Sequence, residues 1–449
     1  MTAEVAIPGS PAVGIARPTT RLSAGSLVRI SLYWLGLSSV FIGLNQILDG
    51  RMATGALGPD AQREVGGTLF RLTVAGSVIA ALVQPTIGTL SDYTASRWGR
   101  RKPYIVIGST LDLVFLAGIA FSSDLVAIAA FIMMLQVSAN FAQGPFQGYI
   151  PDLVPAEQTG IASSLVGLFS VLGQVCGFGI AAAALATDSF ALGTLALGLL
   201  EFAMMFSVVV RVPDGPPARD RMGRSWVTVA REAWGSDILR QRNFLLIVAS
   251  RLLILMGGTM LINFSPLFLM RTLGIDQHAT FAPNLALIAA VVVGNAIAVI
   301  PAGRVGDRIG RRPVVWAACL MAAAGMALCA TATGNGSLPL QVVLGAGLFG
   351  TGMGSFLSVD WALLTSVVPG AAGGRYMGIS NVATAMAGVF SIATGGPLLD
   401  AVDAATFGNG ARAAFALAVG YLILGMLPLI WVREPPRGKP GPSAVAAAA

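Results

Sequence analysis

The sequence predicts an all-α membrane protein whose twelve transmembrane helices form two six-helix halves. Hydrophobic residues make up 55% of the chain and charged residues only 11%, with a mean hydropathy of +0.77. A water-soluble domain carries roughly 25% charged residues, so this chain has too few charges to cover a water-facing surface. Lipid must therefore surround most of it, and two further observations, a set of long apolar segments and a duplicated motif, give the number and grouping of the helices.

The apolar segments are each about 20 residues or longer, which is the length that a helix needs to cross the hydrocarbon core of a bilayer. Short polar or charged stretches separate them. The expected spans are 27–48, 67–91, 103–122, 125–150, 160–185, 189–211, 243–270, 279–303, 312–332, 338–367, 376–399 and 410–432.

The longest charged interval lies in the middle of the chain and divides the spans into two sets of six. It contains several prolines and arginines, and a short surface helix is expected around 225–238. Both chain ends are rich in proline and small residues, a composition that favours disorder. The expected parts are a cytoplasmic tail (1–26), a six-helix bundle (27–211), a cytoplasmic linker (212–242), a second six-helix bundle (243–432) and a cytoplasmic tail (433–449).

The positive charges predict the orientation in the membrane. The chain has 28 Lys and Arg against 21 Asp and Glu, a net charge of +7. With both termini inside, all the basic residues lie on the cytoplasmic side except Arg51, Arg63, Arg71, Arg271 and Arg412. This bias follows the positive-inside rule. It predicts a multi-pass protein of the cytoplasmic membrane. It also accounts for the basic charge, so we expect no nucleic-acid partner. We expect a monomer in the lipid bilayer.

Metal, cofactor and enzyme chemistry find no support in the sequence. The three cysteines, Cys176, Cys319 and Cys329, fall inside apolar spans and lack the spacing of metal ligands. Their expected role is that of small buried apolar residues. We find no nucleophile–base constellation and no phosphate-binding loop, so we expect neither a cofactor nor an enzyme.

One short motif occurs twice, once in each half. Each copy has a glycine, an aspartate four residues later and a closing Gly-Arg-Arg, and the two copies lie 215 positions apart. Pro155 and Pro369 repeat at nearly the same offset, 214. Internal repeats of this kind are typical of secondary transporters. The motif residues are Gly88, Asp92, Arg97, Gly99, Arg100 and Arg101 in the first copy and Gly303, Asp307, Arg308, Gly310, Arg311 and Arg312 in the second.

These loops resemble the signature loop of the major facilitator superfamily. The stretches VQPTIGTLSDYTASRWGRRKPYI (83–105) and QGPFQGYIPDLVP (143–155) resemble the branch that contains sucrose transporters and glycoside–cation symporters. The resemblance implies the major facilitator fold, alternating access around a central cavity, and a cytoplasmic gate that the motif helps to close. A motif aspartate would accept hydrogen bonds at a neighbouring helix N-terminus. The alternative is that the arginines only fix the topology.

Four amides of the fourth span predict where a solute could bind. Gln136, Asn140, Gln143 and Gln147 are spaced so that they share one stripe of a helix. Amides donate and accept hydrogen bonds, which suits a hydroxyl-rich neutral solute, and the resemblance implies that the fourth helix lines the cavity. The alternative is hydrogen bonding between helices. Further candidates for substrate binding are Trp34, Asn45, Asn263 and Trp361.

Asp360 in the tenth span is the candidate proton-coupling residue. Acidic residues inside a membrane are costly and mark function by default. The repeat alignment places Asp360 and Trp361 opposite Phe146 and Gln147. The alternative is an aspartate paired with an arginine for packing alone. Asp112 and Glu201 are weaker candidates, because the resemblance makes their helices peripheral or intermediate.

The leading prediction is a secondary active transporter for a small polar organic solute, such as a sugar or glycoside, coupled to protons or another ion. One departure from the resembling branch affects the coupling: Gln136 and Gln147 stand where plant-type sucrose transporters have an acidic residue and an arginine. Two alternatives stay open. Efflux of an amphipathic compound would use the methionine-rich spans (Met256, Met260, Met353), and a non-transporting assembly factor or sensor would have a filled cavity.

Overall fold

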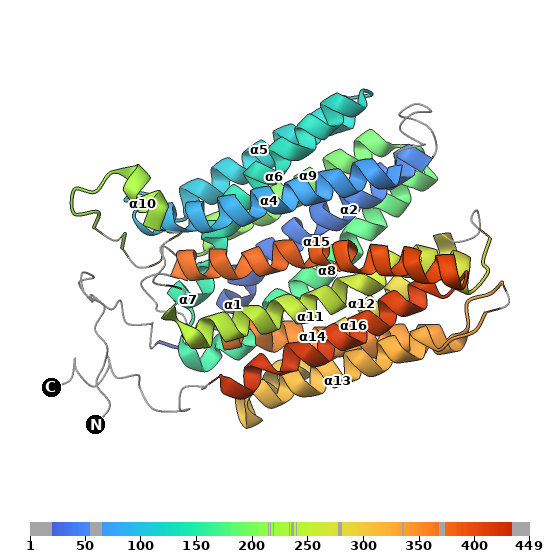
Figure 1. Cartoon of the computed structure of the whole chain (residues 1–449). Coiled ribbons are helices and arrows are strands. Elements are labelled where there is room, and N and C mark those ends of the chain that lie inside the picture. The colour runs from blue at the N-terminus through green and yellow to red at the C-terminus, as the bar shows by residue number, and fades with distance from the viewer. Residues whose placement is uncertain are drawn as a thin grey trace.

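The computed structural model is a bundle of long helices that run roughly along one direction (Figure 1). It describes residues 20–53, 65–213, 215, 217–218, 220–232, 234, 238, 240–276, 281–334, 336–367 and 373–432. Within this part of the chain, twelve helical segments are long and apolar enough to cross a membrane. The predicted all-α fold of twelve spans is therefore confirmed, while the expected tails 1–26 and 433–449 lie outside the described residues, apart from 20–26.

The first half contains six spans, two of which are interrupted. The first span breaks at Leu32 and the fourth at Gly148, so each consists of two helices. The first-half helices are α1 (Ala24–Ser31) with α2 (Tyr33–Ala53), α4 (Val65–Asp92), α5 (Lys102–Phe121), α6 (Leu125–Gln147) with α7 (Tyr149–Leu153), α8 (Thr159–Ala186) and α9 (Phe190–Arg211).

The second half repeats this arrangement after the linker. The linker carries a short helix, α10 (Trp226–Glu232), where the sequence predicts one, and Figure 1 shows it at one end of the bundle. The second-half helices are α11 (Arg242–Leu267) with a π-helical turn (Phe268–Thr272), α12 (Phe281–Ile309), α13 (Arg311–Ala330), α14 (Leu340–Val367), α15 (Gly373–Ala405) and α16 (Gly410–Met426) with a 3₁₀ turn (Pro428–Trp431).

Both copies of the motif lie at the same end of the bundle, which we call the motif end. In each copy the glycine before Arg-Arg has a positive φ, +87° at Gly99 and +116° at Gly310. Side chains disfavour this backbone conformation, so glycine is the residue that fits there. The turn ends the loop and lets α5 or α13 start directly after it.

The two halves meet along two pairs of helices, α4 with α15 and α8 with α12, and α8 also contacts α14. Glycines make these contacts close. A Cβ atom at Gly378 of α15 would lie 2.5 Å from the Pro85 Cα of α4, and one at Gly303 of α12 would lie 1.8 Å from the Ser164 Oγ of α8. Small residues let helix backbones approach in membranes, where dispersion contacts rather than water exclusion hold helices together.

Close backbone contact also holds the helices within each half. At Gly325 of α13, an added Cβ would lie 2.4 Å from the backbone nitrogen of Phe349 in α14. We expect Gly325→Ala to lower the unfolding temperature in detergent, because the methyl group forces two backbones apart at a cost of about 1–3 kcal/mol.

Gly420→Ala is the matched control, since a Cβ there meets nothing within 4 Å. Alanine is favoured over glycine inside a helix by about 1 kcal/mol, so this variant should unfold at the wild-type temperature or above it. Equal unfolding temperatures for the two variants would contradict the packing argument.

Candidate functional site

The first motif copy forms a buried network of two arginines and two aspartates at the motif end. Arg101 Nη2 lies 3.0 Å from Asp92 Oδ1, and its Nε donates to Asp152 Oδ2 at 2.6 Å. Arg100 Nη2 lies 2.6 Å from the other oxygen of Asp152. All four side chains are at most 1% exposed. The network ties the end of α4 and the start of α5 to α7.

Arg101 is the centre of this network. Burial disfavours its charge, but Asp152 and Asp92 outweigh that cost, so the pKa of Arg101 rises above its usual value. Gly148 makes room for it, because a Cβ there would lie 2.1 Å from the Arg101 Cζ. The absence of a side chain at Gly148 therefore leaves space for the Arg101 guanidinium.

Asp152 was missed by the sequence reasoning, although it lies in the stretch 143–155. The feature that could have identified it is an ionisable side chain at the end of an apolar span. The sequence alone could not show that α7 turns this carboxyl group toward the arginines of a different loop.

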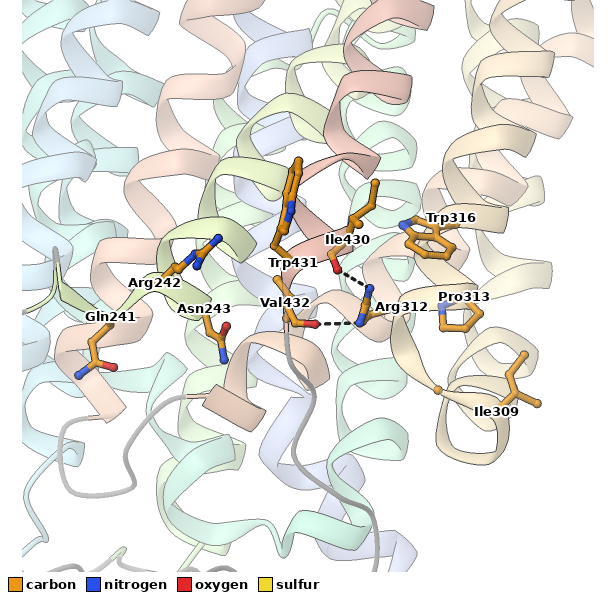
Figure 2. A pocket seen from close by; sticks show the side chains of 11 residues that line it. Gln241, Arg242, Asn243, Ile309, Arg312, Pro313, Trp316, Ile430, Trp431 and Val432 are labelled. Atoms are coloured by element: carbon orange, nitrogen blue, oxygen red, sulfur yellow. Dashed lines mark hydrogen bonds between the residues drawn. The ribbon is translucent and has the colours of Figure 1, made fainter. Parts of the chain in front are cut away.

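The second motif copy is built differently. Asp307 packs against the N-terminus of α8 in the other half, where a Cβ at Gly160 would lie 2.0 Å from Asp307 Oδ1. Arg311 donates to the carbonyl oxygen of Ala362 at 2.5 Å. Arg312 donates to the carbonyl oxygens of Val432 (2.8 Å) and Ile430 (3.1 Å), as Figure 2 shows. These arginines thus bond to the ends of α14 and the 3₁₀ turn after α16.

The two copies differ because the second half lacks the counterpart of Asp152. The repeat offset of 214 leads from Asp152 to Ser366, a neutral side chain whose hydroxyl donates to its own helix at Leu363. Backbone carbonyls take the place of the carboxylate. The remaining motif arginines, Arg97 and Arg308, are exposed, and Gly88 is buried.

The predicted amides of the fourth span join a cluster that crosses between the halves. Gln84 of α4 donates to the Oδ1 of Asn140 and, at 3.2 Å, to the Oε1 of Gln143. Asn381 of α15, in the other half, donates to the Oε1 of Gln84. Asn140 also donates to the carbonyl oxygen of Gln136 at 2.6 Å. Three of the four amides therefore bond along α6 and toward α4, and Gln84 links them to α15.

Gln147, the fourth amide, differs from the others. It is 1% exposed, and in the described part of the chain neither its Nε2 nor its Oε1 has a hydrogen-bond partner. A buried amide without partners is costly.

Aromatic rings next to Gln147 join the two halves. Trp34 lies 5.9 Å from Phe146 in the first half and 5.4 Å from Trp361 in the second, measured between ring centroids. Phe146 directly precedes Gln147, and Trp361 directly follows Asp360. The structure thus brings two predicted residues, Trp34 and Trp361, into ring contact, while Gln147 and Asp360 are chain neighbours of rings in this cluster.

Asp360 pairs with an arginine that the sequence reasoning did not identify. Arg251 Nη1 of α11 donates to Asp360 Oδ2, and its Nε and Nη2 donate to Thr384 Oγ1 of α15 at 3.2 and 3.1 Å. Both charged side chains are at most 5% exposed. The Arg251 guanidinium also lies 5.9 Å from the ring of Trp361. Three helices of the second half therefore meet at one buried ion pair.

The remaining predicted residues lie elsewhere. Asn45 is exposed on α2 and donates to the carbonyl oxygen of Phe41. Asn263 donates to Ser391 Oγ at 3.3 Å, linking α11 to α15. Neither has a recorded contact with the aromatic rings or with Asp360.

We expect Asp152→Asn to lower the stability of the protein. Breaking a buried ion pair by removing one charge costs roughly 3–5 kcal/mol, because the arginines are left with less compensation. The unfolding temperature in detergent measures the effect. Glu157→Gln is the control, since its ion pair with Arg21 is 70% exposed on the Glu157 side, and a control that loses as much stability would contradict the argument.

We also expect Asn381→Ala to loosen the motif end. A hydrogen bond between membrane helices contributes about 1 kcal/mol, so its loss shifts the open population about fivefold. A cysteine introduced as Ser164→Cys, under Gly303 of α12, should then react faster with a maleimide. Gln341→Ala removes an amide that bonds only to Leu328 and Thr331, and it should leave the labelling rate unchanged.

Comparisons with known proteins agree with this architecture. The family model of the Major Facilitator Superfamily matches residues 35–294 and 250–448. The sucrose transport protein SUC3 of Arabidopsis thaliana is 27% identical over 161 residues, which are 30% of this chain and 27% of that protein. The chain thus matches only about a quarter of the length of this relative.

Solved structures show the same fold. The proton:xylose symporter XylE, bound to 6-bromo-6-deoxy-D-glucose, superposes with a TM-score of 0.69 at 18% identity, covering 91% of this chain and 96% of that one. The transporter FucP in the outward conformation gives 0.65 at 13% identity, covering 92% and 99%. The twelve spans, the duplicated motif and the matching family model lead to one conclusion: this multi-pass membrane protein belongs to the Major Facilitator Superfamily of transporters.

Proposed function

We propose that the chain moves a small polar organic solute, of the sugar or glycoside class, across the cytoplasmic membrane by alternating access coupled to protons. Gln147 carries this proposal: among the described residues it is a buried amide without hydrogen-bond partners, and it follows Phe146, whose ring belongs to the cluster that joins the halves. Aromatic faces and amides together suit a sugar, which offers C–H faces to the rings and hydroxyls to the amide. The sucrose transport relatives support the same solute class.

Alternating access fits the contacts at the motif end. Here the halves touch through α4 with α15, through α8 with α12, and through Trp34 with Trp361. We infer that this end faces the cytoplasm, as the basic loops predict, and that the contacts close it. Opening requires the Gln84–Asn381 bond, the Asp307 contact with α8 and the ring contact to separate together.

Arg251 and Asp360 support proton coupling. A proton on Asp360 neutralises the carboxylate and so removes its electrostatic attraction to Arg251. Arg251 keeps its bonds to Thr384, and its Nη1 becomes available to the hydroxyls of a solute. Uptake of the proton and of the solute would in this way depend on the same guanidinium group.

The test is solute uptake into proteoliposomes with an imposed pH gradient, using a panel of sugars, glycosides and amphipathic drugs. We expect the wild type to accumulate a sugar or glycoside uphill. Asp360→Asn should retain exchange of labelled for unlabelled solute but lose the uphill accumulation, because a neutral amide cannot carry the proton.

Asp403→Asn is the matched control. Asp403 is also an aspartate paired with an arginine (Arg271 Nη1, 3.0 Å), but it lies near the opposite end of α15. It should keep uphill transport. Uphill transport by Asp360→Asn at the wild-type level would refute the coupling role, and preference for the amphipathic drugs would favour efflux.

A further inference from the structure

A pair of carboxyl groups lies buried in the first half, away from Arg251 and Asp360. Glu201 of α9 and Asp112 of α5 are in side-chain contact, and they are 2% and 0% exposed. Hydroxyl groups surround them. Tyr33 of α2 donates to Glu201 Oε1 at 3.0 Å and also bonds to Ser109 of α5, while Ser138 of α6 donates to Asp112 Oδ1.

No positive charge compensates this pair in the described part of the chain. The groups that face it from the four surrounding helices are Tyr33, Ser109, Ser138 and the two acids themselves, and neither acid forms a recorded ion pair. The second oxygen of Asp112, Oδ2, is buried and has no donor among the described residues. Two carboxylates in contact cannot both be ionised in a buried site. A proton on one of the two acids is therefore the compensation that this site lacks.

We propose that Asp112 and Glu201 form a second proton-binding site, distinct from Asp360, whose protonation keeps the motif end closed. The proposal rests on the proposed proton-coupled function and adds to it a site in the other half. With the proton present, one hydrogen bond joins the acids. When the proton leaves, two negative charges repel each other in a medium of low polarity.

The contacts of Tyr33 connect this site to the gate. Tyr33 is the first residue of α2, and Leu32 before it keeps helical backbone angles, so a shift of Tyr33 is passed along the same span. Its ring packs edge-on against Phe146 at 4.8 Å, and the next residue, Trp34, carries the ring contact to Trp361 of the second half. Separation of the acids removes the bond that holds Tyr33 and thereby displaces Trp34.

Helix packing at the pair makes such a displacement effective. A Cβ at Gly36 of α2 would lie 2.8 Å from the Cα of Glu201, so α2 and α9 are in backbone contact one turn beyond Tyr33. A shift of the Glu201 side chain or of α9 therefore acts directly on the span that carries Trp34.

The experiment measures the opening of the motif end as a function of pH without any solute. Spin labels are placed through Trp98→Cys and Ile309→Cys, two residues that are 52% and 60% exposed near the two motif copies. The native cysteines are replaced first. We expect the distance between the labels to lengthen as the pH rises in the wild type, and to stay short at every pH in Glu201→Gln and in Asp112→Asn.

The reason for this expectation is that an amide supplies permanently the hydrogen that the shared proton supplies reversibly. Glu157→Gln, an exposed acid, is the control and should keep the wild-type pH profile. A wild-type profile in both Glu201→Gln and Asp112→Asn would overturn the proposal, as would a wild type whose label distance is independent of pH.

Infrared spectroscopy of the wild type and Asp360→Asn gives a second readout that needs neither variant of the pair to fold. In both proteins, the band of a protonated carboxyl group should be present at low pH and disappear at alkaline pH. If Asp360→Asn shows no such band at low pH, a site separate from Asp360 is refuted. Neither measurement depends on transport, so a failure to transport sugars would refute the proposed function and leave this test unaffected.

Discussion

The close approach of α4 to α15 and of α8 to α12 is the contact on which the arrangement of the two halves depends. At Gly378 an added Cβ would lie 2.5 Å from the Pro85 Cα, and at Gly303 it would meet the hydroxyl of Ser164. In a membrane, such contacts replace the water exclusion that joins helices in soluble proteins. They also bring Gln84 within reach of Asn381, and Asp307 onto the N-terminus of α8. The polar contacts between the halves thus follow from the packing of small residues.

The duplicated motif serves two different purposes in the two halves. In the first half, its arginines are neutralised by Asp92 and Asp152, which belong to the same half. In the second half, the arginines bond to carbonyl oxygens at helix ends, and Asp307 reaches across to the first half. One loop sequence therefore stabilises one half internally and connects the halves at the other copy, where Ser366 stands at the position that corresponds to Asp152.

Each half also buries acidic side chains that lead to the Trp34–Trp361 contact, and the negative charge is compensated differently in the two halves. Asp360 is neutralised by Arg251, so the pair is sensitive to any group that competes for the guanidinium. Among the described residues, Asp112 and Glu201 have only hydroxyl groups and each other as partners, so a proton is the available compensation. We propose that both sites act on the Trp34–Trp361 contact, Asp360 as the neighbour of Trp361 and Glu201 through Tyr33.

The sequence by itself determined the twelve spans, their division into halves and the family, because span length, polarity and a repeated loop are local properties of the chain. It also singled out Asp360, Trp361 and the amides of α6 as costly residues inside a membrane. Only the tertiary structure decided their partners. The pairing of Arg251 with Asp360, of Asp152 with Arg101 and of Gln84 with Asn381 joins residues 51 to 297 positions apart. Such pairings depend on how the helices rotate and pack, and no periodicity within one span records that.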